Sequence, residues 1–253
     1  MPINSDFTPF LSVVIPAFNE QDRIRPTLKH ALGYLDCRDY PSEVIVVSDG
    51  SRDHTVRVAQ DFHCSDHVRV QALEYHPNRG KGYAVRYGML RGRGRIMMFM
   101  DADYAVPMEY CQHGLELIDQ GYDIAIASRA VDGSLIQEHQ NTLRQLSARI
   151  YTFIQNLYLG IDFPDTQCGF KFFSREAAQS LFSLQKLDSV IFDPEILWLA
   201  RKKGFRVAQF PVQWRHVADS RIQYDNLRKS LFVFQELMRI KQLHRGSGLR
   251  QGK

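Results

Sequence analysis

Two acidic side chains stand directly after a short apolar run. Asp101 and Asp103 follow residues 96–100, which read Ile-Met-Met-Phe-Met, and only Ala102 separates them. Two carboxylates at positions i and i+2 beyond a buried strand can share one cation. Oxygen ligands favour Mg²⁺ or Mn²⁺, which in turn hold phosphate oxygens. The pair alone would also fit a solvated turn, but its place after an apolar run favours a metal site.

A glycine-rich segment supplies positive charge for an anionic ligand. Asn78, Arg79, Gly80, Lys81 and Gly82 follow one another and open a predicted helix. Glycines permit close backbone approach and a helix N-terminus attracts anions, so the segment would suit a diphosphate. It is not a P-loop, because the GxxxxGK[ST] pattern is absent. An ordinary glycine-rich turn is the alternative.

A third polar cluster lies in a strand-like stretch between residues 165 and 171. Asp165, Gln167 and Lys171 surround Gly169, and a glycine inside a strand often marks close approach by a ligand. The alternative is a turn into a hairpin, capped by Asp165. The nine histidines are scattered and form no ligand set, and no GxSxG pattern of a serine hydrolase is present.

The elements that position these residues follow from the apolar periodicity. Up to residue 129, short apolar runs alternate with helical patterns. We expect strands at 11–15, 43–47, 68–73, 95–100 and 123–127, and helices at 22–35, 54–62, 80–91 and 108–120. This order predicts an α/β fold with an open, mostly parallel sheet flanked by helices. Ligands bind such sheets at the carboxyl ends of the strands, where the polar motifs fall.

Beyond residue 129 the alternation changes. Residues 131–140 are polar and predict a loop. Further on we expect helices at 142–159, 192–203 and 226–244, with strands within 162–174 and 205–212. We expect this half to add elements to the same sheet and not to form an independent second domain. The sequence predicts one domain over 1–221, with halves at 11–129 and 130–221, followed by an amphipathic tail at 222–253.

Composition bounds the class of protein. The chain has 253 residues, with 44% hydrophobic and 24% charged, which excludes a disordered chain, a collagen and a coiled coil. No apolar run is longer than that of residues 96–100, whereas a membrane span needs about 18–20 such residues. The N-terminus has no leader pattern, and the four cysteines form no CxxC pair. These features predict a cytoplasmic protein with reduced thiols.

The positive charge of the chain is concentrated in its tail. From residue 226 onward the tail carries seven basic residues and one acidic residue, Glu236. Leu227, Leu231, Phe234, Met238 and Leu243 approximate one helical face, and the basic residues are Arg228, Lys229, Arg239, Lys241, Arg245, Arg250 and Lys253. Such a helix can lie on the cytoplasmic face of an anionic membrane, or it can pack on the core or in a homo-oligomer interface. We expect no nucleic-acid partner, because stacking aromatics do not interleave the tail's charges.

The polar segments occur in a recognisable order. They are Ser12 to Glu20, Val47 to Ser51, Asn78 to Gly82, Asp101 to Asp103, Ala127 to Arg129, and Asp165 to Lys171. Together they resemble the inverting family-2 glycosyltransferases, which have the GT-A fold. Within that family the chain is most similar to the dolichyl-phosphate β-glucosyltransferases and other polyprenyl-phosphate glycosyltransferases. The family usually has a second Asp where this chain has Ser48. This chain also lacks the membrane helices that some relatives carry.

The resemblance implies roles for individual residues, which we state as expectations. Pro16, Ala17, Phe18, Glu20 and Asp49 should bind the nucleoside of a sugar nucleotide. Asp101, Ala102 and Asp103 should bind its diphosphate, with Gly80 and Lys81 nearby, and the two aspartates should hold Mg²⁺ or Mn²⁺. Arg129 and Arg144 should face phosphates of donor or acceptor. Asp165, Gln167 and Lys171 should lie near the sugar and acceptor.

The resulting hypothesis is transfer of glucose from UDP-glucose to a polyprenyl phosphate, with inversion. A phosphate acceptor needs no general base, because its second pKa is about 6. With an alcohol or soluble sugar as acceptor, Asp165 or Asp193 would be the candidate base. GDP-mannose is an alternative donor. A catalytically silent protein that binds nucleotide sugars is the alternative outside enzymes.

Overall fold

The computed structural model describes residues 7–62, 65–136, 142–215 and 227–246, with the side chains of residues 136, 142–148 and 227–230 outside the description. Seven strands form one sheet in the order β3-β2-β1-β4-β7-β5-β8. The strands are β1 (Leu11–Ala17), β2 (Ser42–Asp49), β3 (Val68–Tyr75), β4 (Ile96–Met100), β5 (Ile124–Ser128), β7 (Phe170–Ser174) and β8 (Val207–Pro211). All neighbouring pairs are parallel except those of β7. The predicted α/β fold with a mostly parallel sheet is therefore confirmed.

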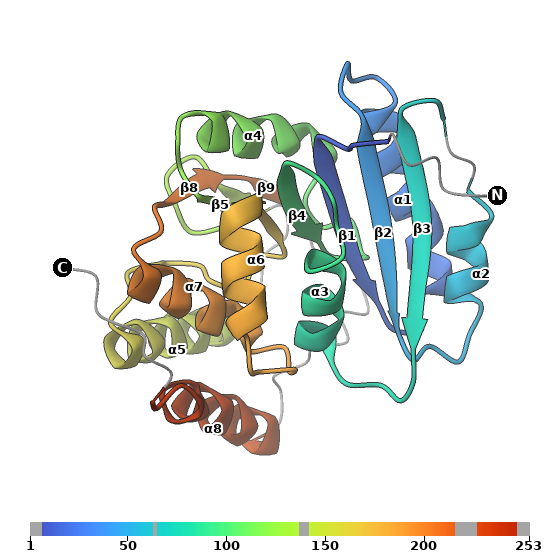
Figure 1. Ribbon diagram of the computed structural model, residues 1–253. Coiled ribbons are helices and arrows are strands. Elements are labelled where there is room, and N and C mark those ends of the chain that lie inside the picture. The colour runs from blue at the N-terminus through green and yellow to red at the C-terminus, as the bar shows by residue number, and fades with distance from the viewer. Residues whose placement is uncertain (1–6, 63–64, 137–141, 216–226, 247–253) are drawn as a thin grey trace.

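Helices cover both faces of the sheet (Figure 1). One face packs on α1 (Gln21–Leu35), α2 (Thr55–Gln60) and α4 (Cys111–Asp119), which follows the short 3₁₀ turn η1 (Met108–Tyr110). The other packs on α3 (Lys81–Met89), α6 (Arg175–Leu184) and α7 (Phe192–Lys203). Alternate residues of β1 enter the two cores: Val13 and Ile15 one, Val14 the other. Burial on both faces explains why the strands read as continuous apolar runs.

Strand β7 is the main departure from a simple alternating fold. It lies between β4 and β5 and runs antiparallel to both. An apolar run carries no information about its own direction, so the sequence predicts the strand but not its place. Helix α6 directly follows β7 and has no counterpart among the expected elements. Its start is marked by Ser174, whose Oγ accepts a hydrogen bond from the Ala177 amide at 3.2 Å.

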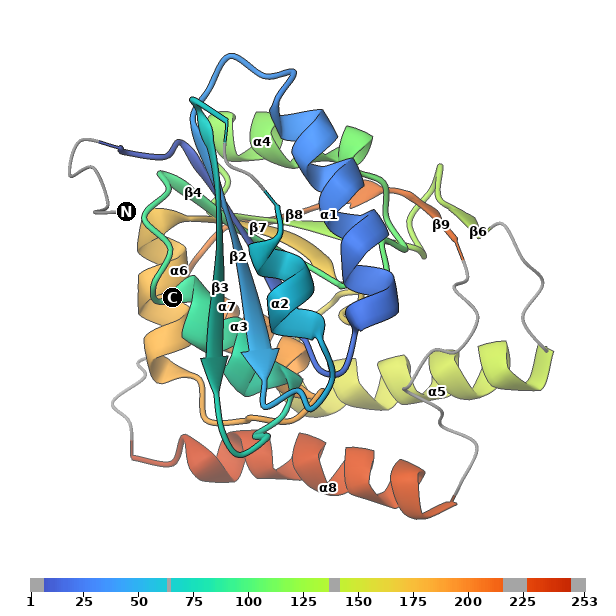
Figure 2. The ribbon, with the colours of Figure 1, turned by 90° about the vertical axis from the view of Figure 1, so that its right-hand side faces the viewer.

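The predicted polar loop at 131–140 holds a short strand, β6 (Leu135–Ile136), which pairs with β9 (Gln213–Trp214) in a second, two-stranded sheet. Two further helices, α5 (Thr142–Leu159) and α8 (Leu227–Leu243), lie side by side at the end of the molecule where β1, β2 and β3 finish (Figures 1 and 2). The seven-stranded sheet takes strands from both predicted halves of the chain, and the division at residue 129 stays a prediction. In the described part of the chain, no helix has the length and apolar character needed to cross a membrane.

Helix α8 is attached to the rest of the molecule through buried polar groups. Glu195 on α7 is buried, and its carboxylate accepts hydrogen bonds from the amides of Lys186 and Leu187, both at 2.9 Å. His244, just beyond α8, has Nε2 only 2.6 Å from Oε1 of Glu195. Glu236 on α8 accepts a hydrogen bond from Ser189 Oγ at 2.7 Å. The C-terminal helix is thereby joined to the connection between α6 and α7.

Substitution His244→Ala should destabilise the fold, because Glu195 loses a partner in a buried setting. We expect the free energy of unfolding to fall by about 1–3 kcal/mol, measured by urea denaturation at pH 7. Gln242→Ala, at an exposed position in the last turn of α8, is the matched control and should change little. Equal stability of the two variants would contradict the attachment.

Candidate active site

The loops that follow β1 and β2 are joined by hydrogen bonds. The Asn19 amide donates to Ser51 Oγ at 3.0 Å, and the Arg52 amide donates to Asn19 Oδ1 at 2.7 Å. Asn19 and Gly50 both adopt positive φ angles, +51° and +68°, which allow these tight turns. The two loops therefore form one rigid wall at the carboxyl edge of the sheet.

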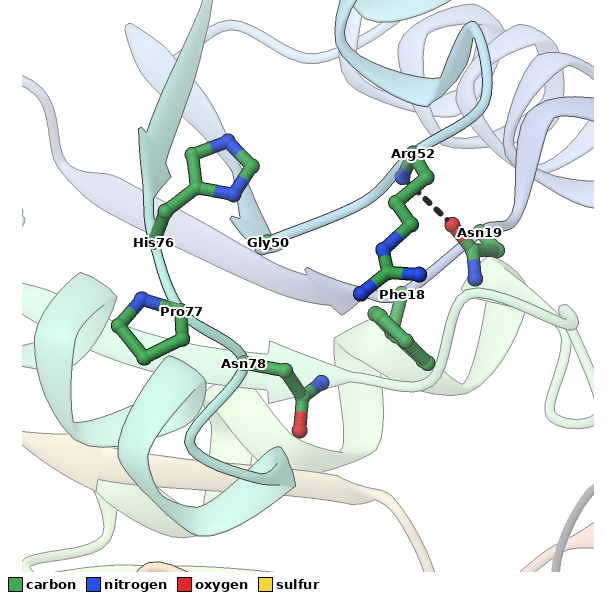
Figure 3. A pocket seen from close by; sticks show the side chains of 7 residues that line it. All are labelled: Phe18, Asn19, Gly50, Arg52, His76, Pro77 and Asn78. Carbon is green, nitrogen blue, oxygen red and sulfur yellow. Dashed lines mark hydrogen bonds between the residues drawn. The ribbon is translucent and has the colours of Figure 1, made fainter.

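This wall borders a cavity of about 610 Å³. Figure 3 shows Phe18, Asn19 and Arg52 on one side of it and His76, Pro77 and Asn78 on the other, with Gly50 between them. Volumes of this size are typical of small-molecule sites. The cavity combines an aromatic ring, a guanidinium and amide groups, which suits a nucleoside.

The residues expected to bind a nucleoside fall into two groups. Phe18 lines the cavity. Pro16 and Ala17 are buried at the end of β1, and Glu20 pairs with Arg23 through a 2.6 Å contact to Nε. These three position the wall. Arg52, His76 and Asn78 also line the cavity; the sequence could have indicated Arg52, which directly follows the Asp49-Gly50-Ser51 turn.

Asp49 holds the glycine-rich segment in place. Its carboxylate accepts hydrogen bonds from Asn78 Nδ2 and the Gly80 amide, both at 2.8 Å, and from the Arg79 amide at 2.7 Å. The side chain is almost fully buried. Its expected contact with the nucleoside stays a prediction, because these hydrogen bonds direct the carboxylate toward the segment at 78–80.

The glycines of this segment have a structural reason to be glycines. A β-carbon on Gly80 would overlap the carbonyl of Asp188, and one on Gly82 would meet the carbonyls of Leu187 and Ser189. The close approach inferred from the sequence is thus made by the connection between α6 and α7. It places Lys81 at the first turn of α3, directed to the end of β4.

Lys81 meets the acidic pair there. Its Nζ lies 2.6 Å from Oδ1 of Asp101. Burial lowers the pKa of Lys81, but the negative charges of Asp101, Asp193 and Asp103 outweigh it and raise the pKa above its ordinary value. Lys81 therefore stays charged and neutralises Asp101.

Asp103 is left with less positive charge than Asp101. Burial and the negative charge of Asp101 raise the pKa of Asp103 above its ordinary value of 3.8. Its Oδ1 accepts a hydrogen bond from the Ala105 amide at 3.1 Å. Ala102 between the aspartates is buried, and its carbonyl accepts from Thr27 Oγ1 at 2.7 Å. This fixed pair of carboxylates fits a divalent cation that would offset the crowded negative charge.

Gly169 explains how Asp101 can lie where it does. The Asp101 amide donates to the Gly169 carbonyl at 3.0 Å, and a β-carbon on Gly169 would overlap the Asp101 carboxylate. The feature that approaches this glycine is therefore the first aspartate of the acidic pair. The antiparallel course of β7 brings the two together.

Arg129 and Asp165 form a bidentate ion pair at the end of β5. Arg129 Nε lies 2.7 Å from Oδ2 of Asp165 and Nη2 lies 2.9 Å from Oδ1. The Arg129 amide and the Gln167 amide also donate to this carboxylate. Burial would raise the pKa of Asp165, but the Arg129 guanidinium charge and these hydrogen bonds hold the pKa below its ordinary value. The Arg129 side chain is 30% exposed and lies over the ring of Trp214, a residue that the sequence analysis did not single out.

Lys171 forms a second buried pair. Its Nζ lies 2.5 Å from Oδ1 of Asp193 and donates to the Cys168 carbonyl at 2.6 Å. The side chains of Lys171 and Asp193 are 1% and 3% exposed. The structure thus places Lys171 where it supports the turn before Gly169. Direct contact of Lys171 with a substrate stays a prediction, and Arg144, on α5, has a side chain outside the described residues.

The described residues contain no group of three or more His, Cys, Asp or Glu side chains placed to hold a metal ion. A cation at Asp101 and Asp103 would therefore take further oxygen ligands from its substrate.

Comparison with known proteins decides the family. The model of Glycosyl transferase family 2 matches residues 12–182. This chain belongs to that family. It is 37% identical over 228 residues to the dolichyl-phosphate beta-glucosyltransferase of Drosophila melanogaster, covering 84% of this chain and 69% of the relative. The corresponding human protein is 35% identical over 226 residues, with the same coverage of both chains.

A solved structure shows the same fold. Glucosyl-3-phosphoglycerate synthase from Mycobacterium tuberculosis, in complex with Mn²⁺, UDP and glucosyl-3-phosphoglycerate, aligns with a TM-score of 0.65 at 19% identity. The alignment covers 92% of this chain and 78% of that one. The resemblance to family-2 glycosyltransferases with a GT-A fold is confirmed, and this chain is a sugar-transferring enzyme.

Substitution Asp165→Asn should destabilise the enzyme in a pH-dependent way. Because the pKa of Asp165 is lowered in the folded state, its contribution is present at neutral pH and is lost as the pH falls through the folded-state pKa. We expect the free energy of unfolding at pH 7 to fall by about 2–3 kcal/mol. Denaturant titrations should show the gap to wild type closing as the pH falls below the ordinary aspartate pKa of 3.8 and through the lower folded-state pKa. A gap that is constant with pH would contradict the ion pair.

Proposed function

We propose that this enzyme transfers glucose from UDP-glucose to a polyprenyl phosphate, with inversion at the anomeric carbon. Four relatives that match 84–92% of the chain are named dolichyl-phosphate beta-glucosyltransferases, which supports both the sugar and the class of acceptor. The fold neighbour that binds UDP and Mn²⁺ supports the donor and the cation.

The donor fits along the carboxyl edge of the sheet. The nucleoside occupies the cavity beside Phe18, Arg52 and Asn78. The diphosphate extends to Asp101 and Asp103, with Lys81 beside them. A Mg²⁺ or Mn²⁺ ion held by the two aspartates would stabilise the negative charge that builds on the diphosphate as the bond to the sugar breaks.

The burial and ion pairing of the two candidate bases, Asp165 and Asp193, are the observation that supports a phosphate as the acceptor. An alcohol must lose a proton to a base as it attacks. Asp165 is buried, has a lowered pKa and is bound by Arg129, while Asp193 is 3% exposed and bound by Lys171. Neither is placed to take a proton from an acceptor. A phosphate needs none, since it is mostly dianionic at neutral pH.

In the proposed reaction an oxygen of the acceptor phosphate forms a bond to the anomeric carbon, and the bond from that carbon to the UDP oxygen breaks. The electron pair of that bond leaves with UDP. Arg129, held rigid by Asp165 and partly exposed beside Trp214, attracts and aligns the acceptor phosphate. Arg144 is proposed to assist it. Lys171 and Asp193 position the turn at Cys168 and Gly169, which supports Asp101.

Substitution Asp103→Asn tests the proposal most directly. Purified enzyme is supplied with Mn²⁺ or Mg²⁺, UDP-glucose and a short polyprenyl phosphate, and extractable glycolipid and released UDP are measured. We expect kcat to fall about 100-fold or more, because the cation loses a charged ligand. Asp119→Asn, which changes an exposed aspartate on α4, is the control and should retain activity.

Donor and acceptor panels separate the alternatives. Glycolipid formed from GDP-mannose in preference to UDP-glucose would replace the donor. UDP release with a soluble sugar or alcohol but not with a polyprenyl phosphate would overturn the acceptor. Calorimetric binding of UDP-glucose with no turnover on any acceptor would favour the silent binding protein.

Substitution Arg52→Ala tests the nucleoside cavity separately from chemistry. Loss of one charge-assisted hydrogen bond should raise the Kd for UDP about tenfold, measured by isothermal titration calorimetry. The control is Arg57→Ala, which changes an exposed arginine on α2. Unchanged UDP affinity in the Arg52 variant would show that the nucleoside binds elsewhere.

A further inference from the structure

The exposed apolar side chains of this enzyme are concentrated on two helices. Among the described residues, nine of the eleven exposed large apolar side chains belong to α5 and α8. On α5 they are Ile150, Phe153, Ile154 and Leu157, which follow the i, i+3, i+4, i+7 spacing of one helical face. Phe153 and Leu157 are 69% and 74% exposed. Exposure of a contiguous group of large apolar side chains to water is unfavourable and marks an interaction surface.

Helix α8 carries a matching stripe. Leu231, Phe234 and Met238 are exposed and share one face, at spacings of three and four residues. The opposite face carries Leu237 and Ile240, which are buried in the core. The amphipathic helix expected in the tail therefore has apolar residues on both sides, one toward the core and one toward solvent. Leu243, expected on the same helical face as these three residues, falls on another side of the helix at this periodicity, and the side chain of Leu227 lies outside the described residues.

The two stripes form one surface. The ring of Tyr151 on α5 meets the ring of Phe234 on α8 at 5.8 Å, and Tyr158 Oη donates to the Met238 carbonyl at 3.0 Å. These contacts fix the rotation of each helix relative to the other. Both stripes then lie beside the line of contact, on the side away from the core. We call the seven residues of the two stripes the α5–α8 apolar face.

The exposed charges on the described parts of these two helices have one sign. On the described parts of α5 and α8 and the turn that follows α8, the exposed charged side chains are Arg149, Arg239, Lys241 and Arg245. The one acidic residue there, Glu236, is buried and bonded to Ser189 and Arg239. An apolar strip on two helices whose described exposed charges are all cationic complements an anionic membrane surface.

The face also stands at a useful place in the molecule. Helices α5 and α8 lie at the end of the molecule to which β1, β2 and β3 point (Figure 2). The cavity and the acidic pair are at this same edge of the sheet. A bilayer in contact with the helices would therefore present its head groups at the end that carries the candidate site.

We propose that the α5–α8 apolar face docks this enzyme reversibly on an anionic lipid bilayer. The proposal deepens the proposed function, on which it rests for its purpose: docking would deliver the phosphate of a membrane-anchored acceptor to the site. Phe153, Leu157 and Leu231 insert among the lipids, while Arg149, Lys241 and Arg245 contact anionic head groups.

Vesicle co-sedimentation of the full chain tests the face directly. The probes are phosphatidylcholine vesicles with and without about 30% phosphatidylglycerol. We expect binding to the anionic vesicles, and the double variant Phe153→Ser/Leu157→Ser should reduce the bound fraction about tenfold or more. The matched control is Leu135→Ser, which removes an apolar side chain that is 56% exposed on β6, off the face. It should bind as wild type does.

Phe153→Ser/Leu157→Ser and Leu135→Ser change exposed residues, so thermal melts should show that both proteins remain folded. Salt gives an independent readout, because binding of Arg149→Glu/Arg245→Glu to anionic vesicles should be weaker and less salt-sensitive than that of wild type. Undiminished binding by Phe153→Ser/Leu157→Ser would overturn the proposal. So would a wild-type dimer in analytical ultracentrifugation that this variant converts to a monomer while wild type ignores vesicles.

Transfer assays distinguish failure of this proposal from failure of the proposed function. With a short, water-soluble prenyl phosphate, Phe153→Ser/Leu157→Ser should keep its activity, and with a long polyprenyl phosphate in vesicles it should lose most of it. Equal activity of variant and wild type on the long lipid would overturn the docking role. Vesicle binding without transfer to either lipid would retain the docking face and reject the acceptor.

Discussion

The carboxylate of Asp101 packs against the backbone of Gly169, where β4 ends beside the start of β7. This contact exists because β7 runs against its neighbours and so begins at the edge where the parallel strands end. Any side chain at residue 169 would push the acidic pair out of place. The reversal of a single strand thus brings the segment at 165–171 to the site that the first half of the chain forms.

Charged groups at this edge are fixed by one another before any substrate binds. Lys81 pairs with Asp101, Arg129 with Asp165, and Lys171 with Asp193. Buried ion pairs contribute little net stability, because desolvation offsets much of the attraction. Their value here is geometric. They hold cationic groups and the turn before β7 in fixed positions, so that little reorganisation is needed when negative charge develops.

The C-terminal helix α8 is connected to this site through a series of buried contacts. The Glu195 carboxylate accepts hydrogen bonds from the amides of Lys186 and Leu187 and contacts His244. The neighbouring carbonyls of Leu187 and Asp188 lie close to Gly82 and Gly80. A continuous set of contacts therefore runs from α8 through the connection between α6 and α7 to the N-terminus of α3. The outer surface of α8 is left apolar and basic, next to the apolar stripe of α5.

The sequence by itself determined the order of strands and helices, the polar residues at strand ends and the family. These are local properties: apolar periodicity follows from burial on both faces of a sheet, and short motifs keep their residue types and spacing. Phe18 at the cavity and Asp101 beside Lys81 follow from that level. Only the tertiary structure decided the direction of β7, the burial of Asp165 and Lys171, the part that Arg52 and His76 take in the cavity, and which side of α8 meets the core. Each of these features depends on contacts between segments that are distant along the chain. A local sequence pattern does not specify which distant segment a residue will contact.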